Sequence, residues 1–233
     1  MSSNRPLVVA ILHSDEDDID YQLYCAAYGI EMQVDDEWNA EAILLAPHDH
    51  LHAVTENTGV TGEDAAIVSA GVTDIPAAAD GSFDASVIED PQNNWLLVGD
   101  PRRSDTDDVI TKKLQAALAA DCRAIICIAD TTHQHIAARL HGLASIDCSR
   151  IVIAFVHPDA TTPSVAAAAA SAIRDHIASV GASGQARLIV SGNITGENAA
   201  DVVGIDGVDG VLLMDDKYDD FGTILEVLET LGE

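Results

Sequence analysis

Apolar and β-branched residues recur along the chain in short continuous runs, separated by loops and by segments of helical periodicity. Continuous apolar runs, as opposed to alternating ones, are typical of strands covered on both faces, and therefore of a parallel sheet. The runs that predict strands are LVVAIL (7–12), AILLA (42–46), AAIVSA (65–70), WLLVG (95–99), AIICIA (124–129), IVIAFV (151–156), LIVSG (188–192) and GVLLM (210–214). Between them, amphipathic segments predict helices, most clearly at 107–121, 163–180 and 221–232.

Eight strand-and-helix units in one chain of 233 residues predict an α/β fold, a single closed (β/α)8 TIM barrel over residues 1–233. The alternative is a doubly wound open sheet. That alternative is weakened because no GxGxxG motif follows the first strand.

The charge balance limits the partners that the chain can have. The chain carries 39 acidic and 11 basic residues, for a net charge of −28. Nucleic acids and anionic membranes are bound by Lys and Arg, so we expect neither as a partner. The apolar runs fall short of the roughly 18 residues of a membrane helix, and MSSNRPLVVAIL lacks the cleavage region of a signal peptide. We therefore expect a cytoplasmic protein, whose four cysteines, none in CxxC spacing, are buried free thiols.

In a (β/α)8 barrel the functional residues lie where strands end and the following loops begin. These positions are His13 with Ser14, His48 to His52, Gly71, Asp100, Asp130, His157, Gly192 with Asn193, and Asp215 with Asp216. Imidazoles and carboxylates that converge at strand ends suit zinc or a similar ion. The candidate metal ligands are His13, Asp100, Asp130, His157 and Asp215. The other interpretation is that the histidines are solvated loop residues and the aspartates cap helices.

Several segments resemble the triosephosphate isomerase family. WLLVGDPRRSDTDDVITKKLQAALAADCRAIICIAD (95–130) is similar to that family's fourth strand, its G-H-S-E-R-R motif, the next helix and the fifth strand. VSGNITGENAADVVGIDGVDGVLL (190–213) resembles its G-G-S-V-T-G-E-N-A and D-V-D-G segments. The resemblance implies a TIM barrel that needs no cofactor. It also implies a dimer formed through the loop after the third strand, although SAGVTDIPAAADGSFD (69–84) is short enough that a monomer is also possible.

The chemical groups of that family do not appear at the matching positions. Triosephosphate isomerase is a standard example of a glutamate base acting with a neutral histidine electrophile under a loop that excludes water. Here the family's lysine position falls on His13 and its electrophile on Asp100, while its glutamate falls on Val156 or His157. About five residues separate His157 from the next helix, too few for the closing loop.

The phosphate site of the family is altered in the same way. Gly192 and Asn193 could still offer backbone N–H donors, but the family's glycine pair falls on Met214 and Asp215, with Asp216 next. Two like unit charges about 5 Å apart repel by roughly 3 kcal/mol at an effective dielectric constant of about 20. A phosphate group is therefore disfavoured at this end of the barrel.

Three hypotheses follow. The first is a triosephosphate isomerase-like barrel that has lost isomerase activity and serves as a binding or regulatory module. The second is an active isomerase whose site residues align differently, and the third is a barrel with a His/Asp metal site and a hydrolytic activity. In each case Arg102 and Arg103 match the family's R-R pair, and we expect them to form a structural ion-pair site.

The acidic excess also predicts a dependence on salt. We interpret it as adaptation to a high-salt cytoplasm, where a Debye length of roughly 3 Å or less screens self-repulsion; an acidic partner-binding face is the alternative. The melting temperature should therefore rise as KCl is increased from dilute buffer to molar concentration. A melting temperature that stays constant over that range would rule out this interpretation.

Overall fold

The computed structural model describes residues 5–12, 19–33, 39–56, 58, 61–62, 65–66, 68–78, 82–85, 88, 94–140, 148–180, 186–214 and 221–232. In chain order its elements are β1 (Leu7–Ile11), α1 (Ile19–Gln33), β2 (Glu41–Ala46), η1 (His48–His50), α2 (Leu51–Thr55), β3 (Thr61–Gly62), β4 (Ala65–Ala66), β5 (Val68–Val72), β6 (Trp95–Val98), α3 (Asp107–Ala119), β7 (Arg123–Ile128), α4 (His133–Arg139), η4 (Cys148–Arg150), β8 (Ile151–Val156), α5 (Pro163–Ser179), β9 (Arg187–Ser191), α6 (Gly196–Val203), β10 (Gly210–Leu213) and α7 (Phe221–Gly232).

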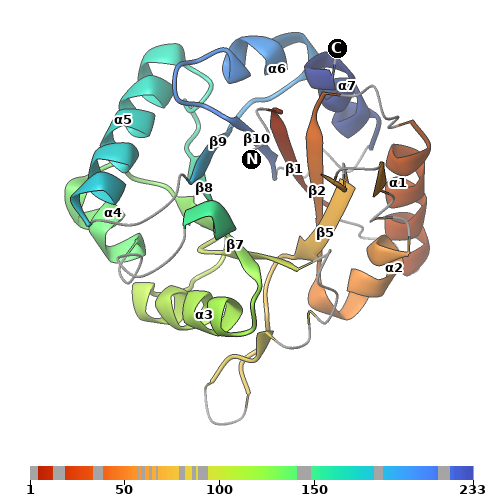
Figure 1. Ribbon diagram of the computed structural model, residues 1–233, viewed down its shortest axis with the longest axis horizontal. Helices are drawn as coiled ribbons and strands as arrows, with labels where there is room; N and C mark the ends of the chain where they lie inside the picture. Colours follow the sequence, from red (N-terminus) through yellow and green to blue (C-terminus); the bar gives the residue numbers. More distant parts are fainter. Residues whose placement is uncertain are drawn as a thin grey trace.

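Parallel strands close into a barrel in the order β1-β2-β5-β6-β7-β8-β9-β10 and back to β1. The ring closes because Leu7 of β1 is in register with Glu41 of β2 on one side and with Gly210 of β10 on the other. Figure 1 looks down this barrel and shows the helices as an outer ring. The predicted (β/α)8 barrel is confirmed, and the open sheet is excluded.

The continuous apolar runs are explained by two layers of packing around each strand. In β1, Leu7, Val9 and Ile11 belong to the barrel interior. The alternating residues Val8 and Ala10 point outward and pack in the layer that includes residues of α1 and α7. Because both faces of the strand are covered, every residue of β1 is buried and no polar alternation appears in its sequence.

The third barrel strand lies later in the chain than the sequence pattern predicts. Ala65–Ala66 form β4, which pairs antiparallel with β3 outside the barrel, and the barrel strand is β5. Gly71 therefore lies within a strand, in register with Trp95, and its prediction as a residue of the barrel mouth is wrong. A Cβ at Gly71 would lie 2.4 Å from the Trp95 carbonyl oxygen, so glycine is what allows β5 and β6 to approach.

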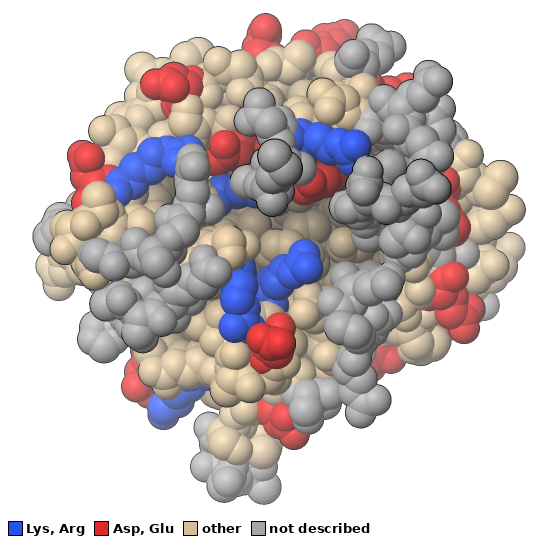
Figure 2. Space-filling model, viewed as in Figure 1, with Lys and Arg blue, Asp and Glu red and all other residues tan. Residues whose placement is uncertain are grey.

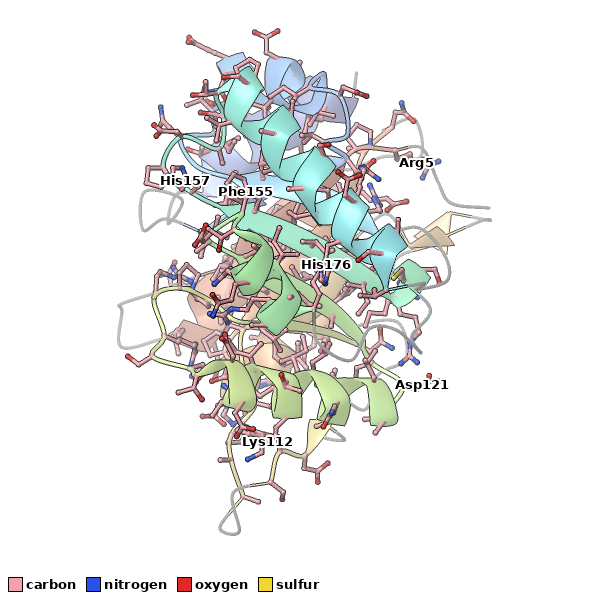
Figure 3. The ribbon with its side chains drawn as sticks, turned by 90° about the vertical axis from the view of Figure 1, so that its left-hand side faces the viewer. Arg5, Lys112, Asp121, Phe155, His157 and His176 are labelled. Carbon is pink, nitrogen blue, oxygen red and sulfur yellow. The ribbon has the colours of Figure 1, made fainter. Side chains whose placement is uncertain are left out.

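The two ends of the barrel differ in character. Figure 3 places Arg5 and Asp121, which precede β1 and β7, at one end and His157, which follows β8, at the other. The end where strands begin faces the viewer in Figure 2, and basic side chains gather there beside acidic ones. At this end Arg187 binds Glu41 of β2 and the Arg5 carbonyl oxygen, and so ties β9 to the first two strands. Within the described parts of the chain, no helix combines the length and apolar character that crossing a membrane requires.

Candidate functional site

A pocket of about 570 Å³ opens at the end of the barrel where the strands finish. Its lining comes from the loops after β6 to β10, namely Pro101, Ala129, Val156, His157, Pro158, Ser191, Gly192, Asn193 and Met214. Among the described residues of this lining, His157 alone has an ionisable side chain. The pocket wall within the described residues is therefore mainly apolar, with a few hydrogen-bonding groups from β9 and its loop.

Beside this pocket, Asp100 is a carboxylate held inside the protein at 4% exposure. It follows Gly99, whose φ of 77° lies in the left-handed region that glycine tolerates best. The Asp100 carboxylate accepts hydrogen bonds from the backbone N–H of Arg102 at 2.9 Å, and from its Nε and Nη2 at 3.1 and 2.8 Å. This two-pronged contact is the geometry in which a guanidinium binds a carboxylate most strongly.

The environment of Asp100 keeps it ionised. Burial is the largest single influence and raises its pKa, but the side-chain and backbone hydrogen bonds from Arg102 act in the opposite direction, as do the charges of Arg102 and Arg103. Together they hold the pKa of this carboxyl below its ordinary value of 3.8. At neutral pH Asp100 is a hydrogen-bond acceptor already occupied by Arg102, and it has no proton to donate.

Arg102 also joins two distant parts of the barrel. Its Nη1 donates to the carbonyl oxygen of Met214, which follows β10 and lies 112 residues further along the chain. The guanidinium thus fixes the loop after β6 to the end of β10 at the edge of the pocket. Beneath it, Cys127 is fully buried, and this burial raises the pKa of its thiol well above the ordinary value, so the thiol stays protonated.

Arg103 forms a separate network on the outer side of the same loop. It pairs with Asp74 at 2.6 Å, and Asp74 also pairs at 2.6 Å with Lys113 of α3. Lys113 is buried, with Asp105 as its second carboxylate partner and the ring of Phe83 at 5.3 Å. Arg102 and Arg103 therefore both form ion pairs, but with different partners and on different sides of the loop.

His157 lies at the end of β8 with its ring fixed. The ring stacks on Phe155 at 5.7 Å between centroids and 3° between planes, and Figure 3 shows the two side by side. Its Nδ1 accepts a hydrogen bond from the backbone N–H of Asp159 at 3.1 Å. An acceptor nitrogen carries no proton, so in the neutral ring the proton is on Nε2. Nε2 is then a donor, and a nitrogen that carries a proton cannot remove one from a ligand.

Gly192 and Asn193 form the part of the pocket wall next to His157. A Cβ at Gly192 would lie 3.3 Å from the His157 carbonyl oxygen, so this loop packs closely on the loop after β8. Asn198 of α6 accepts from the Thr195 N–H at 2.8 Å and donates to the Asn193 carbonyl oxygen at 2.8 Å. The loop that leads into α6 is therefore stabilised by the protein's own side chains, as in a capping box.

Asp130 and the histidines of η1 and α2 do not line this pocket, and Ser14 lies outside the described residues. Asp130 is exposed and accepts from the Thr132 N–H and hydroxyl at 2.9 and 3.1 Å. The Thr132 backbone hydrogen bond is the main reason that the pKa of Asp130 is lowered. The histidines of η1 and α2 contact acidic neighbours: His48 pairs with Asp49 at 2.6 Å, and His50 with Asp20 of α1 at 2.7 Å.

Of the predicted metal ligands, the structure describes Asp100, Asp130 and His157. His13, Asp215 and Asp216 lie outside the described residues. Among the described residues, no group of three or more His, Cys, Asp or Glu is arranged to hold a metal ion. Asp100 and Asp130 are instead engaged by Arg102 and Thr132.

The sequence pattern did not indicate two features of this site. One is the contribution of Pro101 and Ser191 to the pocket lining, since neither residue type carries a strong chemical signal. The other is the contact of Arg102 with the Met214 carbonyl oxygen, which depends on three-dimensional closure of the barrel. The proximity of Arg102 to Asp100 in sequence could have suggested their ion pair.

Comparison with known proteins agrees with this architecture. The family model of triosephosphate isomerase matches residues 25–227. The chain belongs to the triosephosphate isomerase family. It is 27% identical over 217 residues to the triosephosphate isomerase of Rhodopirellula baltica, covering 80% of this chain and 84% of that protein. It is 25% identical over 202 residues to that of Nitratidesulfovibrio vulgaris (strain DP4), covering 74% of this chain and 79% of that protein.

Because the chain belongs to the triosephosphate isomerase family, its pocket can be compared with the active site of that family. The sequence motifs predict that Asp100 takes the place of the family's electrophilic histidine and that Val156 or His157 takes the place of its glutamate. Val156 and His157 line the pocket, and the lining contains no carboxylate among its described residues, since Asp100 lies beside the pocket and not in its wall. The barrel fold of the family is present in this chain.

The Asp100–Arg102 pair yields a prediction on stability. Substituting Arg102→Met leaves a buried carboxylate without its main partner. Because Arg102 is 37% exposed, we discount the cost of breaking a fully buried pair and expect a loss of about 1–3 kcal/mol in the free energy of unfolding at pH 7. Denaturant unfolding at fixed salt measures this loss.

The pH dependence provides the control. A carboxyl whose pKa is lowered by folding stabilises the folded state above its unfolded pKa, and this contribution is lost as the pH falls through the folded pKa. The difference between wild type and Arg102→Met should therefore be largest near neutral pH and shrink below pH 3.8. The double variant Asp100→Asn/Arg102→Met should be more stable than Arg102→Met at pH 7. An Arg102→Met variant as stable as wild type would contradict this role.

Proposed function

We propose that this member of the triosephosphate isomerase family no longer isomerises triose phosphates and that its mouth pocket binds a small uncharged molecule. The observation that carries the proposal is the state of Asp100, a buried carboxylate bound on two sides by Arg102. An electrophile must donate a hydrogen bond or a positive charge to the substrate carbonyl. An ionised aspartate whose oxygens are occupied can do neither.

The base position supports the same proposal. Val156 has no ionisable group, and the ring of His157 uses Nδ1 as an acceptor for the Asp159 N–H, which leaves Nε2 as a donor. A general base needs a free acceptor within reach of the proton that it removes. A ligand carbonyl or hydroxyl oxygen could instead accept a hydrogen bond from His157 Nε2.

The pocket lining favours an uncharged ligand. Pro101, Ala129, Val156, Pro158 and Met214 provide apolar surface, and Ser191 and Asn193 provide hydrogen-bonding groups. The lining offers an anion no Lys or Arg among its described residues, and Arg102 nearby is neutralised by Asp100. Such a pocket suits a small hydroxylated or carbonyl compound more than a phosphate ester.

We further propose that the protein works in a cytoplasm of concentrated salt. Its net charge of −28 supports this setting, and the salt dependence of its melting temperature tests it. A metal-dependent hydrolase is not favoured, because the described candidate ligands Asp100, Asp130 and His157 are not brought together as a metal group.

Binding of a phosphate ester tests the proposal directly. Titration calorimetry with 2-phosphoglycolate should give no saturable heat with this protein, since its pocket presents no unpaired cation from the described residues. The Rhodopirellula baltica triosephosphate isomerase, measured in parallel, is the positive control. Saturable binding by this chain that is lost in Gly192→Asp would contradict the proposal.

An uncharged probe tests the positive half of the proposal. Saturation-transfer NMR with dihydroxyacetone should detect contact with the wild-type protein. Ala129→Trp, which fills the pocket from an exposed position of its rim, should abolish that signal. A signal unchanged by Ala129→Trp would place the binding outside this pocket.

A further inference from the structure

Helix α1 is apolar on two opposite faces, although only one of them packs on the barrel. Leu23, Ala27 and Ile30 are buried in the layer between helices and strands. On the other side lie Tyr21, Tyr24, Tyr28 and Met32, which we call the tyrosine stripe. At 3.6 residues per turn these four positions fall within about 80° of one another around the helix axis, opposite the buried face.

The tyrosine stripe is an unusual concentration of exposed apolar surface. Tyr21, Tyr24, Tyr28 and Met32 are 60%, 37%, 45% and 64% exposed, and they are the exposed large apolar side chains of the described residues. The chain has four tyrosines in all, so three of them are on this one stripe. The rings of Tyr24 and Tyr28 stack at 6.1 Å with 5° between planes, which presents a flat, preformed surface.

The charges on and around the tyrosine stripe limit the kind of partner that can bind it. The stripe itself carries no charge, and the acidic residues of α1 include Asp20 and Glu31 on its flanks. At the right-hand edge of Figure 2, where Figure 1 places α1, the surface is mainly uncharged with acidic side chains beside it. A second copy of this chain can contact such a surface once salt screens the acidic flanks.

The order of residues along the stripe is self-complementary. If two α1 helices cross antiparallel about a two-fold axis near residues 26 and 27, Tyr21 faces Met32 of the second copy and Tyr24 faces Tyr28 of the second copy. Sulfur–aromatic and aromatic–aromatic contacts of this kind are favourable. A two-fold contact requires one patch that matches itself in this way.

We propose that the tyrosine stripe is the centre of a two-fold contact between two copies of this chain. At about 200 Å² for each large side chain, the exposed fractions give roughly 400 Å² of stripe surface per copy. A stable interface buries about 800 Å² per partner. The contact is therefore a weak, concentration-dependent dimer, strengthened by salt because screening reduces the repulsion between two strongly acidic copies. It is independent of the ligand proposed for the barrel mouth.

Cys25 allows the contact to be trapped in the unmodified protein. It is partly exposed and follows Tyr24, whereas the other three cysteines are buried. A two-fold axis near residues 26 and 27 brings Cys25 close to Cys25 of the second copy. In about 2 M KCl, a short bismaleimide should yield a covalent dimer whose fraction grows with protein concentration. Cys25→Ser should remove it.

Two charge-matched variants distinguish the tyrosine stripe from other surfaces. Tyr28→Glu adds one negative charge to the stripe, and Ala168→Glu adds the same charge at an exposed position of α5. Sedimentation equilibrium should show the dimer dissociation constant raised about tenfold or more by Tyr28→Glu and little changed by Ala168→Glu. Tyr24→Ser/Tyr28→Ser, which adds no charge, should weaken the dimer as well, and circular dichroism verifies that each variant is folded.

Three outcomes would overturn the proposal. The first is a protein that stays monomeric at every concentration in 2 M KCl. The second is a dimer unaffected by Tyr28→Glu, which would place the contact elsewhere. The third is a dimer that weakens as KCl is raised, since such a contact would be held by opposite charges rather than by the tyrosine stripe.

Discussion

The mouth of this barrel depends on one guanidinium. Arg102 neutralises Asp100, which lies at 4% exposure, and at the same time donates to the carbonyl oxygen of Met214. Burying a carboxylate this deeply costs free energy unless the carboxylate is paired and hydrogen-bonded. Arg102 supplies these contacts and at the same time joins the loop after β6 to the end of β10. The charge, the hydrogen-bonding capacity and the shape of that side of the pocket all follow from this contact.

The stability of the barrel wall has a different origin from the order at the mouth. Interior residues such as Val9 and outward residues such as Val8 pack in separate apolar layers, and loop residues such as Ile194 and Met214 extend these layers toward the mouth. At the opposite end, Arg187 ties β9 to Glu41 of β2 and to the Arg5 carbonyl oxygen. The fold of the triosephosphate isomerase family can thus persist while the residues at strand ends change, as expected when function is placed on loops over a rigid scaffold.

Sequence reasoning predicted the elements that periodicity alone specifies. The continuous apolar runs predicted seven of the eight barrel strands close to their observed positions, and α3 and α5 begin at Asp107 and Pro163, as predicted. The third strand was misplaced because Ala65 and Ala66 are as apolar as a barrel strand, whereas Gly71, a poor strand former, pairs with Trp95 inside the barrel. A local sequence pattern does not show which of two apolar runs will pair with the neighbouring barrel strands.

For the site, the sequence predicted that Asp100, His157, Gly192 and Asn193 lie at the mouth, but not how their side chains are engaged. The tautomer of His157 depends on the Asp159 N–H, and the state of Asp100 depends on the direction that Arg102 takes. Tyr21, Tyr24, Tyr28 and Met32 have a helical spacing that is visible in the sequence. Such a spacing usually marks a buried face, and only the packing of Leu23, Ala27 and Ile30 shows that this face is the exposed one.

The loss of isomerisation at the mouth of this family member is the main part of the proposed function. Its most direct test is a coupled assay with D-glyceraldehyde 3-phosphate and, in the reverse direction, dihydroxyacetone phosphate, at neutral pH and high KCl. We expect no isomerisation rate above that of a mock preparation from the same host. A rate that saturates with substrate, is inhibited by 2-phosphoglycolate and falls in the Gly192→Asp variant would contradict it.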